Sequence, residues 1–229
     1  MKILPFNPKS AAGSSGPDES RLGLHARGIN ISELGACEHG IVIVGIADDS
    51  GIKNVGGRPG AKDGPQAARA KLYRFTTGAP AFPLYDLGDV LAESSIEETH
   101  SAATKTILEI ARAGHFPLVL GGGHDLGFPH ALAVLQHRKS RMRICNIDAH
   151  LDVRPTTNGI TSGSPWYLLR EHSLYKETGS RIEEFGIQPH CNAHSLVRYA
   201  SQSGFGLHWL EKIRKTRQPA DRVFAKLLG

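Results

Sequence analysis

The chain has 229 residues, of which 40% are apolar and 7% aromatic, as is ordinary for a globular protein. No apolar run approaches the roughly 18 residues that cross a bilayer, and the N-terminus lacks the apolar core of a signal peptide. We therefore expect a cytoplasmic protein with no membrane partner. Much of the net charge of +5 lies in residues 208–229, as a solvated basic helix face or a surface for anionic partners. No basic patch is interleaved with aromatic residues, so we expect no nucleic-acid partner.

The start of the chain and its clearest helix are marked by local composition. Residues 1–35 are predicted to form partly a loose N-terminal arm of one domain spanning 1–229, because the first 20 residues are rich in proline, serine and glycine. Ser95 and Glu98 form a capping-box pattern, and Gly114 suits a left-handed helix end. The segment between them is therefore predicted to be helical.

Apolar strands alternate with helical segments along the rest of the chain. This alternation predicts an α/β fold in which a mostly parallel sheet is covered by helices on both faces. In chain order the predicted elements are strand 41–46, helix 64–75, helix 95–114, strand 117–120, helix 128–139, strand 142–147, strand 181–187, helix 192–203, strand 205–210, and one or two helices over 210–228 that break near Pro219.

Polar motifs directly follow two of the predicted strands. "GGGHD" (121–125) follows the strand 117–120, and "DAHLD" (148–152) follows the strand 142–147. Ligand sites of parallel sheets lie beyond the carboxyl ends of the strands. We expect these two strands to be neighbours, which would bring both motifs to the same rim.

Imidazole and carboxylate groups at this rim indicate a metal site. His124, Asp148, His150 and Asp152 would be costly to desolvate without a partner, and a divalent cation removes that cost. Mixed carboxylate and imidazole ligands suit Mn²⁺ or Fe²⁺, and Zn²⁺ less specifically. The alternative is an ion-paired, hydrogen-bonded loop. Asp125 is interpreted either as a partner that orients a ligand or as part of a local turn.

Longer motifs in the chain resemble those of a known family. "GIADDSGIKNVGGRPGAKDGPQAARAKL" (45–72), "YDLGDV" (85–90), "LVLGGGHD", "NIDAHLDVRP" and "TSGSPWYLLRE" (161–171) resemble segments of the ureohydrolase family, which includes arginases, agmatinases, guanidinobutyrases and formiminoglutamases. The resemblance covers most of the chain. It implies a three-layer α/β/α, arginase-like fold with two Mn²⁺ ions in the intact site. We expect this fold to be truncated at the C-terminus of the chain.

The resemblance also assigns roles to individual residues. His124 would bind one metal and His150 the other, while Asp148 would bridge the two and Asp152 would hold the first. The implied reaction is hydrolysis of a linear guanidine or amidine, in which a hydroxide bridging the metals attacks the amidine carbon. A carboxylate would then take a proton and give it to the leaving nitrogen. The candidate catalytic residues are Asp148 and His150.

The motifs look closest to those of formiminoglutamases of histidine metabolism, which release glutamate and formamide. Arginase or agmatinase activity is the alternative within the family. Arg154 could pair with a substrate carboxylate, or form a surface or subunit salt bridge. Ser162 and Ser164 could bind the substrate's α-amino or α-carboxylate group, or cap the loop. The partner expected is thus a small amidino or formimino amino acid.

The chain departs from the family by lacking a D-x-D motif, which supplies two further carboxylates in its members. Two explanations stay open: a fragment of a longer enzyme, or a natural short form that acts by binding or assembly. In either case we expect weak retention of one metal or none and little turnover. We also expect a homo-oligomer, because family members commonly associate and an unfinished sheet edge favours association. "GGGHDLG" lacks the spacing of a nucleotide-binding loop, which disfavours a nucleotide-binding domain.

Overall fold

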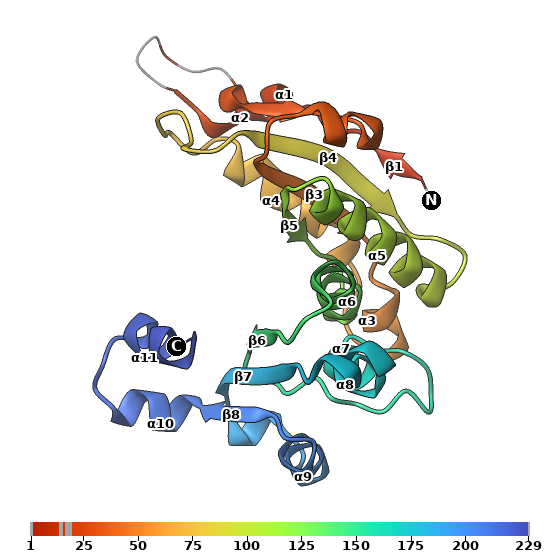
Figure 1. Cartoon of the computed structure of the whole chain (residues 1–229), viewed down its shortest axis with the longest axis vertical. Helices are drawn as coiled ribbons and strands as arrows, with labels where there is room; N and C mark the ends of the chain where they lie inside the picture. Colours follow the sequence, from red (N-terminus) through yellow and green to blue (C-terminus); the bar gives the residue numbers. More distant parts are fainter. Residues whose placement is uncertain (1, 14–15, 17–19, 229) are drawn as a thin grey trace.

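The computed structural model describes residues 2–13, 16 and 20–228, and it contains two separate β-sheets with helices around them (Figure 1). Among the helices of this described part, none is long and apolar enough to cross a membrane. The strands are β1 (Ile3–Leu4), β2 (Ala26–Gly28), β3 (Ile41–Ala47), β4 (Leu84–Leu91), β5 (Phe116–Leu120), β6 (Arg143–Ile147), β7 (Arg181–Ile187) and β8 (Gly206–Trp209). The α-helices are α1 (Pro8–Ala12), α2 (Leu22–His25), α3 (Ser50–Asn54), α4 (Gly64–Leu72), α5 (Ile96–Arg112), α6 (Gly127–Arg138), α7 (Pro165–Glu171), α8 (Ser173–Thr178), α9 (His194–Gln202), α10 (Leu210–Lys215) and α11 (Ala220–Leu228). Short 3₁₀ helices are η1 (Ile31–Ala36), η2 (Ala61–Asp63), η3 (His124–Leu126) and η4 (Pro189–Cys191).

The larger sheet has the strand order β1-β4-β3-β5, with β2 also paired to β4. Only the short β1 runs antiparallel, and the other pairings are parallel. Side chains of a strand point alternately to its two faces. Val44 and Ile46 of β3 therefore pack on one face with Ile107 of α5, while Ile43 packs on the opposite face with Tyr73. The expected three layers are present here.

Helix α5 begins and ends as its sequence predicts. The Ser95 side chain accepts a hydrogen bond from the backbone nitrogen of Glu98, and Gly114 has a φ of 84° beyond the C-terminal end. The Glu98 carboxylate, however, accepts from Ser94 rather than from the backbone of Ser95. The cap therefore forms with a different side-chain partner from the reciprocal capping box.

The smaller sheet is parallel and has the order β6-β7-β8. Ile144 and Ile182 lie on the face that packs against Leu135 of α6 and Leu169 of α7. The opposite face carries Phe185, whose ring contacts that of Phe224 in α11 at 5.2 Å between centroids. A second apolar core thus forms between this sheet and the helices α6 to α9.

Helix α6 contributes to both cores. Ala133 belongs to the core of the larger sheet, whereas Leu132 and Leu135 belong to that of the smaller sheet. In Figure 1, α6 lies between the two sheets. The expectation that β5 and β6 are neighbouring strands is wrong: within the described residues, β5 pairs only with β3, and β6 only with β7. Adjacency along the chain does not determine which strand edges meet.

The N-terminal segment is more structured than its composition predicts. In its described part, residues 1–35 contribute β1 and β2, which both pair with β4. The Phe6 ring stacks on Tyr73 at 5.8 Å, and the Arg69 guanidinium lies 4.9 Å from the centroid of the Phe6 ring. These contacts hold the segment on the sheet, which an arm free of the domain would not allow. Residues 1, 14–15 and 17–19 fall outside the description.

Strands β5 and β6, which each lie at the edge of their sheet, expose apolar side chains. Phe116 is 66% exposed and Ile147 is 69% exposed, and the described residues place no strand beside either edge. Unpaired, apolar strand edges favour self-association. We expect the variant Phe116→Lys/Ile147→Lys to scatter less light than the parent chain at equal concentration. Phe82→Lys, which alters an equally exposed phenylalanine outside both edges, is the control. An equal decrease in both variants would contradict an effect specific to the edges.

Candidate metal centre

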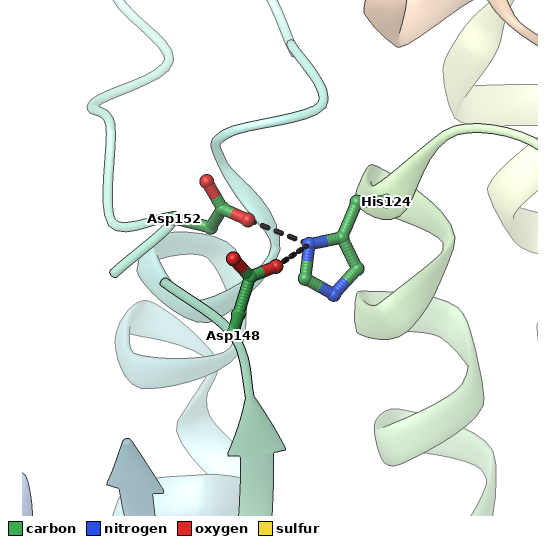
Figure 2. Close-up of side chains that lie close together, drawn as sticks. All are labelled: His124, Asp148 and Asp152. Atoms are coloured by element: carbon green, nitrogen blue, oxygen red, sulfur yellow. Dashed lines mark hydrogen bonds and ion pairs between the residues drawn. The ribbon is translucent and has the colours of Figure 1, made fainter. Parts of the chain in front are cut away.

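Three of the predicted ligands converge beyond the carboxyl ends of β5 and β6. His124 Nδ1 lies 2.6 Å from Asp152 Oδ2 and 3.5 Å from Asp148 Oδ2. Figure 2 shows both carboxylates pointing toward the same imidazole nitrogen, with Asp148 at the tip of its strand. One ligand atom from each residue lies within 4.8 Å of the others. The motifs therefore meet although their strands belong to different sheets.

The glycine loop positions His124 by close backbone contact with the loop after β3. The Gly123 nitrogen donates to the Asp48 carbonyl oxygen at 2.8 Å. A Cβ atom at Gly122 would lie 1.9 Å from that same oxygen, so a side chain could not fit there. Glycine is required because the two backbones approach so closely. The loop after β3 thus fixes the backbone position from which the His124 side chain extends.

Asp125 points away from the three side chains and into the protein. It is 1% exposed, and its Oδ2 lies 2.8 Å from Nε2 of His100, a buried residue of α5. A Cβ atom at Gly51 or Gly123 would lie within 2.4 Å of Asp125 Oδ1, so small residues surround the carboxylate. Asp125 therefore ties the His124 loop to α5, rather than contacting the imidazole directly or only shaping a turn.

The loop after β6 is held by its apolar residues and by one amide. Leu151 and Val153 are fully buried in the core of the smaller sheet. The Leu151 nitrogen donates to Asn192 Oδ1 at 2.9 Å, and Asn192 Nδ2 donates to the Ala149 oxygen at 2.9 Å. Asp152 has a φ of 45°, in the left-handed region that aspartate tolerates better than most residues. This turn directs its carboxylate toward His124.

His150, the fourth predicted ligand, lies beside the group but outside it. Its side chain is 57% exposed, and both its backbone nitrogen and its Nδ1 hydrogen-bond Asp148 Oδ1, at 2.8 Å and 3.0 Å. The alternation along the loop that buries Leu151 turns His150 to solvent. Its assignment as a metal ligand stays a prediction, and its present contact orients Asp148.

The predicted substrate-binding residues differ in how accessible they are. Arg154 is exposed, and its side chain packs over Gly163, where a Cβ atom would lie 2.9 Å from Arg154 Cδ. Ser162 is partly buried and donates its backbone nitrogen to Gly51. Ser164 is fully buried, and its Oγ accepts from the Thr161 nitrogen at 3.3 Å. Ser164 thus caps its own loop in this structure, and its role in substrate binding stays a prediction.

The electrostatics of the site favour a cation. The hydrogen bond to Asp152 raises the pKa of His124, against the effect of its burial. Below the site, Glu184 of β7 is fully buried and accepts a hydrogen bond from Asn146 Nδ2 at 2.8 Å, while its Oε1 has no hydrogen-bond partner among the described residues. Burial raises the pKa of Glu184 to about 9, and the charges of Asp152 and Asp148 add to this effect. The site is thus rich in carboxyl groups, and a bound cation would neutralise the charges of Asp148 and Asp152.

Sequence reasoning missed three residues that support the site. His100 lies in a helix with ordinary amphipathic spacing, and Asn192 lies in a loop, so neither had a signal in the sequence. Glu184 had one, because two consecutive glutamates in the strand "RIEEFGI" place one carboxyl on each face. A carboxyl on a buried face needs a partner or a raised pKa.

The donor set fits a divalent cation. One imidazole nitrogen and two carboxylates within 4.8 Å can surround one ion, and their partial exposure leaves it accessible from solvent. Such mixed nitrogen and oxygen ligands suit Mn²⁺, Fe²⁺ and Zn²⁺. The geometry therefore agrees with the metal site that the motifs predict.

Comparison with known families covers most of the chain. The family model of the arginase family matches residues 39–228. The chain belongs to the arginase family. This assignment confirms the resemblance drawn from the motifs and agrees with the α/β fold and its mostly parallel strands.

Formimidoylglutamases are among the most similar members of the arginase family. That of Geobacillus thermodenitrificans is 36% identical over 195 residues, which cover 82% of this chain and 59% of the relative. That of Aeromonas hydrophila is 31% identical over 207 residues, covering 87% and 66%. The solved Trypanosoma cruzi formiminoglutamase with Mn²⁺ is 31% identical, with a TM-score of 0.72, and covers 86% of this chain and 67% of its own. The chain spans between 42% and 66% of the length of the curated relatives considered.

Proposed function

We propose that this chain carries part of the active site of a formimidoylglutamase, which hydrolyses the linear amidine formiminoglutamate. The reaction would depend on a divalent metal, which we propose to be Mn²⁺. The observation that carries the proposal is the convergence of His124, Asp148 and Asp152, in a chain similar to formimidoylglutamases. The choice of metal is supported by the Trypanosoma cruzi relative, whose crystal structure was solved with Mn²⁺. Glutamate and formamide would be the products.

The residues around the site would have different roles in metal binding, proton transfer and substrate binding. His124, Asp148 and Asp152 would hold the metal, which when bound lowers the pKa of water enough to supply a nucleophile near neutral pH. Asp148 would take a proton from the attacking water and return it to the leaving nitrogen. His150 donates to Asp148 Oδ1 and keeps that carboxylate oriented. Arg154, which is exposed, would bind a carboxylate of the substrate.

Metal binding is the first test. We expect Asp152→Asn to weaken Mn²⁺ binding by at least about 10- to 100-fold, the loss seen even when a residue behind a ligand is changed. Free Mn²⁺ measured by electron paramagnetic resonance during a titration gives the affinity. Asp221→Asn removes an equal charge from the exposed α11 and is the control. Equal affinities of Asp152→Asn and the parent chain would contradict the site. A similar loss in His150→Ala would place His150 among the ligands.

The substrate is tested with a panel. Formiminoglutamate, arginine and agmatine are each incubated with the chain and Mn²⁺, and formamide and urea are measured. We expect slow formamide release that requires the metal, and no urea. Urea release from arginine or agmatine would instead support one of those two activities and contradict the proposed substrate.

A non-catalytic family member is the second candidate. It is favoured by the position of His150 outside the group of three. Such a protein would bind Mn²⁺ through His124, Asp148 and Asp152 but release no formamide at any metal concentration. The metal titration and the panel together therefore separate the two candidates.

A further inference from the structure

A basic hollow lies at the opposite end of the smaller sheet from the candidate metal centre. It has a volume of about 590 Å³ and is lined at the starts of all three strands: Arg141 precedes β6, Ser180 precedes and Arg181 begins β7, and Gly204 precedes β8. Strand β6 has five residues, which at about 3.3 Å each separate this end from Asp148 by roughly 16 Å. The hollow is therefore distinct from the metal centre.

The charge of the lining is strongly positive. Its charged residues are Arg141, Arg170, Lys176 and Arg181, together with the single carboxylate of Glu171. Hydrogen bonds from Lys176 and Tyr199 lower the pKa of Glu171, although burial opposes them, so this carboxylate stays charged at neutral pH. Cations still outnumber anions four to one, and this imbalance favours an anionic occupant.

The cations are unequally neutralised. Lys176 Nζ lies 2.9 Å from Glu171, and Arg181 Nε lies 2.9 Å from the buried Glu183. Arg170 lies at 3.9 Å from Glu171, too far for a hydrogen bond, and Arg141 has no ion-pair or hydrogen-bond partner for its side chain within the described part of the chain. Two guanidinium groups from separate elements are thus available to a ligand.

We propose that this basic hollow binds a small molecule that bears phosphate groups. Guanidinium groups pair with phosphate oxygens through two parallel hydrogen bonds, and cations placed on separate elements can contact different faces of a tetrahedral group. Arg141 comes from the loop before β6, Arg170 from α7 and Arg181 from β7. Once Glu183, the buried partner of Arg181, is counted with Glu171, two positive charges remain in excess, which match a ligand with two or more negative charges. This site is independent of the proposed function.

Pyrophosphate is the probe, titrated by calorimetry into metal-free protein at low salt. We expect saturable binding of one pyrophosphate per chain that weakens as salt is added. Arg141→Ser/Arg170→Ser should weaken it at least about tenfold, because each lost charge-assisted hydrogen bond has an effect of that order. Lys176→Gln, which removes the charge that α8 contributes to the lining, should also weaken binding and serves as the second variant if the first does not fold. Circular dichroism verifies the fold of each.

Three comparisons decide the result. Arg112→Ser/Arg222→Ser removes the same charge from exposed positions elsewhere and should leave the affinity within about twofold. Asp152→Asn should also leave it unchanged, because the metal centre is not involved. Citrate, an anion with carboxylates only, should bind more weakly than pyrophosphate. No saturable binding, equal weakening in both arginine pairs, loss in Asp152→Asn, or tighter binding of citrate would each overturn the proposal.

Discussion

Replacing Arg69 with methionine is expected to lower the free energy of unfolding by about 3–5 kcal/mol, the loss typical when one partner of a buried ion pair is removed. Arg69 is fully buried in α4. Its Nε and one terminal nitrogen donate to the Asp86 carboxylate at 2.8 Å and 3.0 Å, and it also pairs with Asp89. Methionine fills similar volume but leaves both carboxylates without their cation.

The loss should spread beyond β4, because Arg69 connects several elements. It donates to the Gly88 oxygen at 3.0 Å and lies over the Phe6 ring of the N-terminal segment. Tyr73 donates a further hydrogen bond to Asp86, whose carboxylate is completely buried. Arg69→Lys keeps the charge but not the paired donors, so we expect an intermediate loss.

Urea unfolding followed by circular dichroism at pH 7 measures the effect. Lys71→Met, at an exposed position of the same helix, removes the same charge and is the matched control, with an expected change within about 0.5 kcal/mol. A loss below about 1 kcal/mol for Arg69→Met would show that the two carboxylates find other partners or protonate at little cost.

Glu184→Gln is expected to make the metal-free protein more stable than the parent chain at alkaline pH, by an amount that grows with pH. Burial raises the pKa of Glu184 to about 9 in the fold, from 4.5 in an unfolded chain. Glutamine resembles the protonated side chain and can still accept the hydrogen bond from Asn146. It removes the need to keep a proton on the carboxyl group.

The direction of the effect follows from proton binding. Between pH 4.5 and about 9 the folded chain holds a proton on Glu184 that the unfolded chain has released. The stability that this group contributes is therefore complete below pH 4.5 and is lost as the pH rises toward 9, at up to about 1.4 kcal/mol per pH unit. The glutamine variant lacks this loss, so the difference between the two proteins should be small at pH 5 and large at pH 8.5.

Chemical denaturation at four or five pH values in the presence of a chelator measures the difference. Glu177→Gln, an exposed glutamate in α8, is the control and should run parallel to the parent chain. A constant difference between Glu184→Gln and the parent chain from pH 5 to 8.5 would mean that Glu184 titrates normally. That result would contradict the raised pKa of Glu184 and its interaction with Asp148 and Asp152.

Local pattern was sufficient for much of the fold. The apolar runs 41–46 and 117–120 became β3 and β5 within one residue at each end, because a buried parallel strand needs only side chains that suit a covered surface. The capping pattern at Ser95 likewise located the start of α5. Both signals depend on residues close together in the chain.

Elements that depend on distant partners were not predicted. The strand "LYDLGDVL" of β4 contains Asp86, Gly88 and Asp89 and looks too polar for a buried strand, until Arg69 is placed beside it. The separation of β5 from β6 is another case, because strand edges are paired by the whole fold. Three of the four proposed ligands converge. The direction of the fourth side chain, that of His150, depends on the burial of its neighbour Leu151 in the core of the smaller sheet.

The place of α6 between the two cores has a mechanical consequence for the candidate metal centre. His124 lies just before α6, on the side of the larger sheet, while Asp152 follows a strand of the smaller one. An ion coordinated by both residues would add a cross-link between two units that are also joined by α6 and by hydrogen bonds such as that from Ser162 to Gly51. Amide hydrogen exchange in β3 and β7 would then slow together on adding the ion, as the two units come to unfold in a single cooperative step.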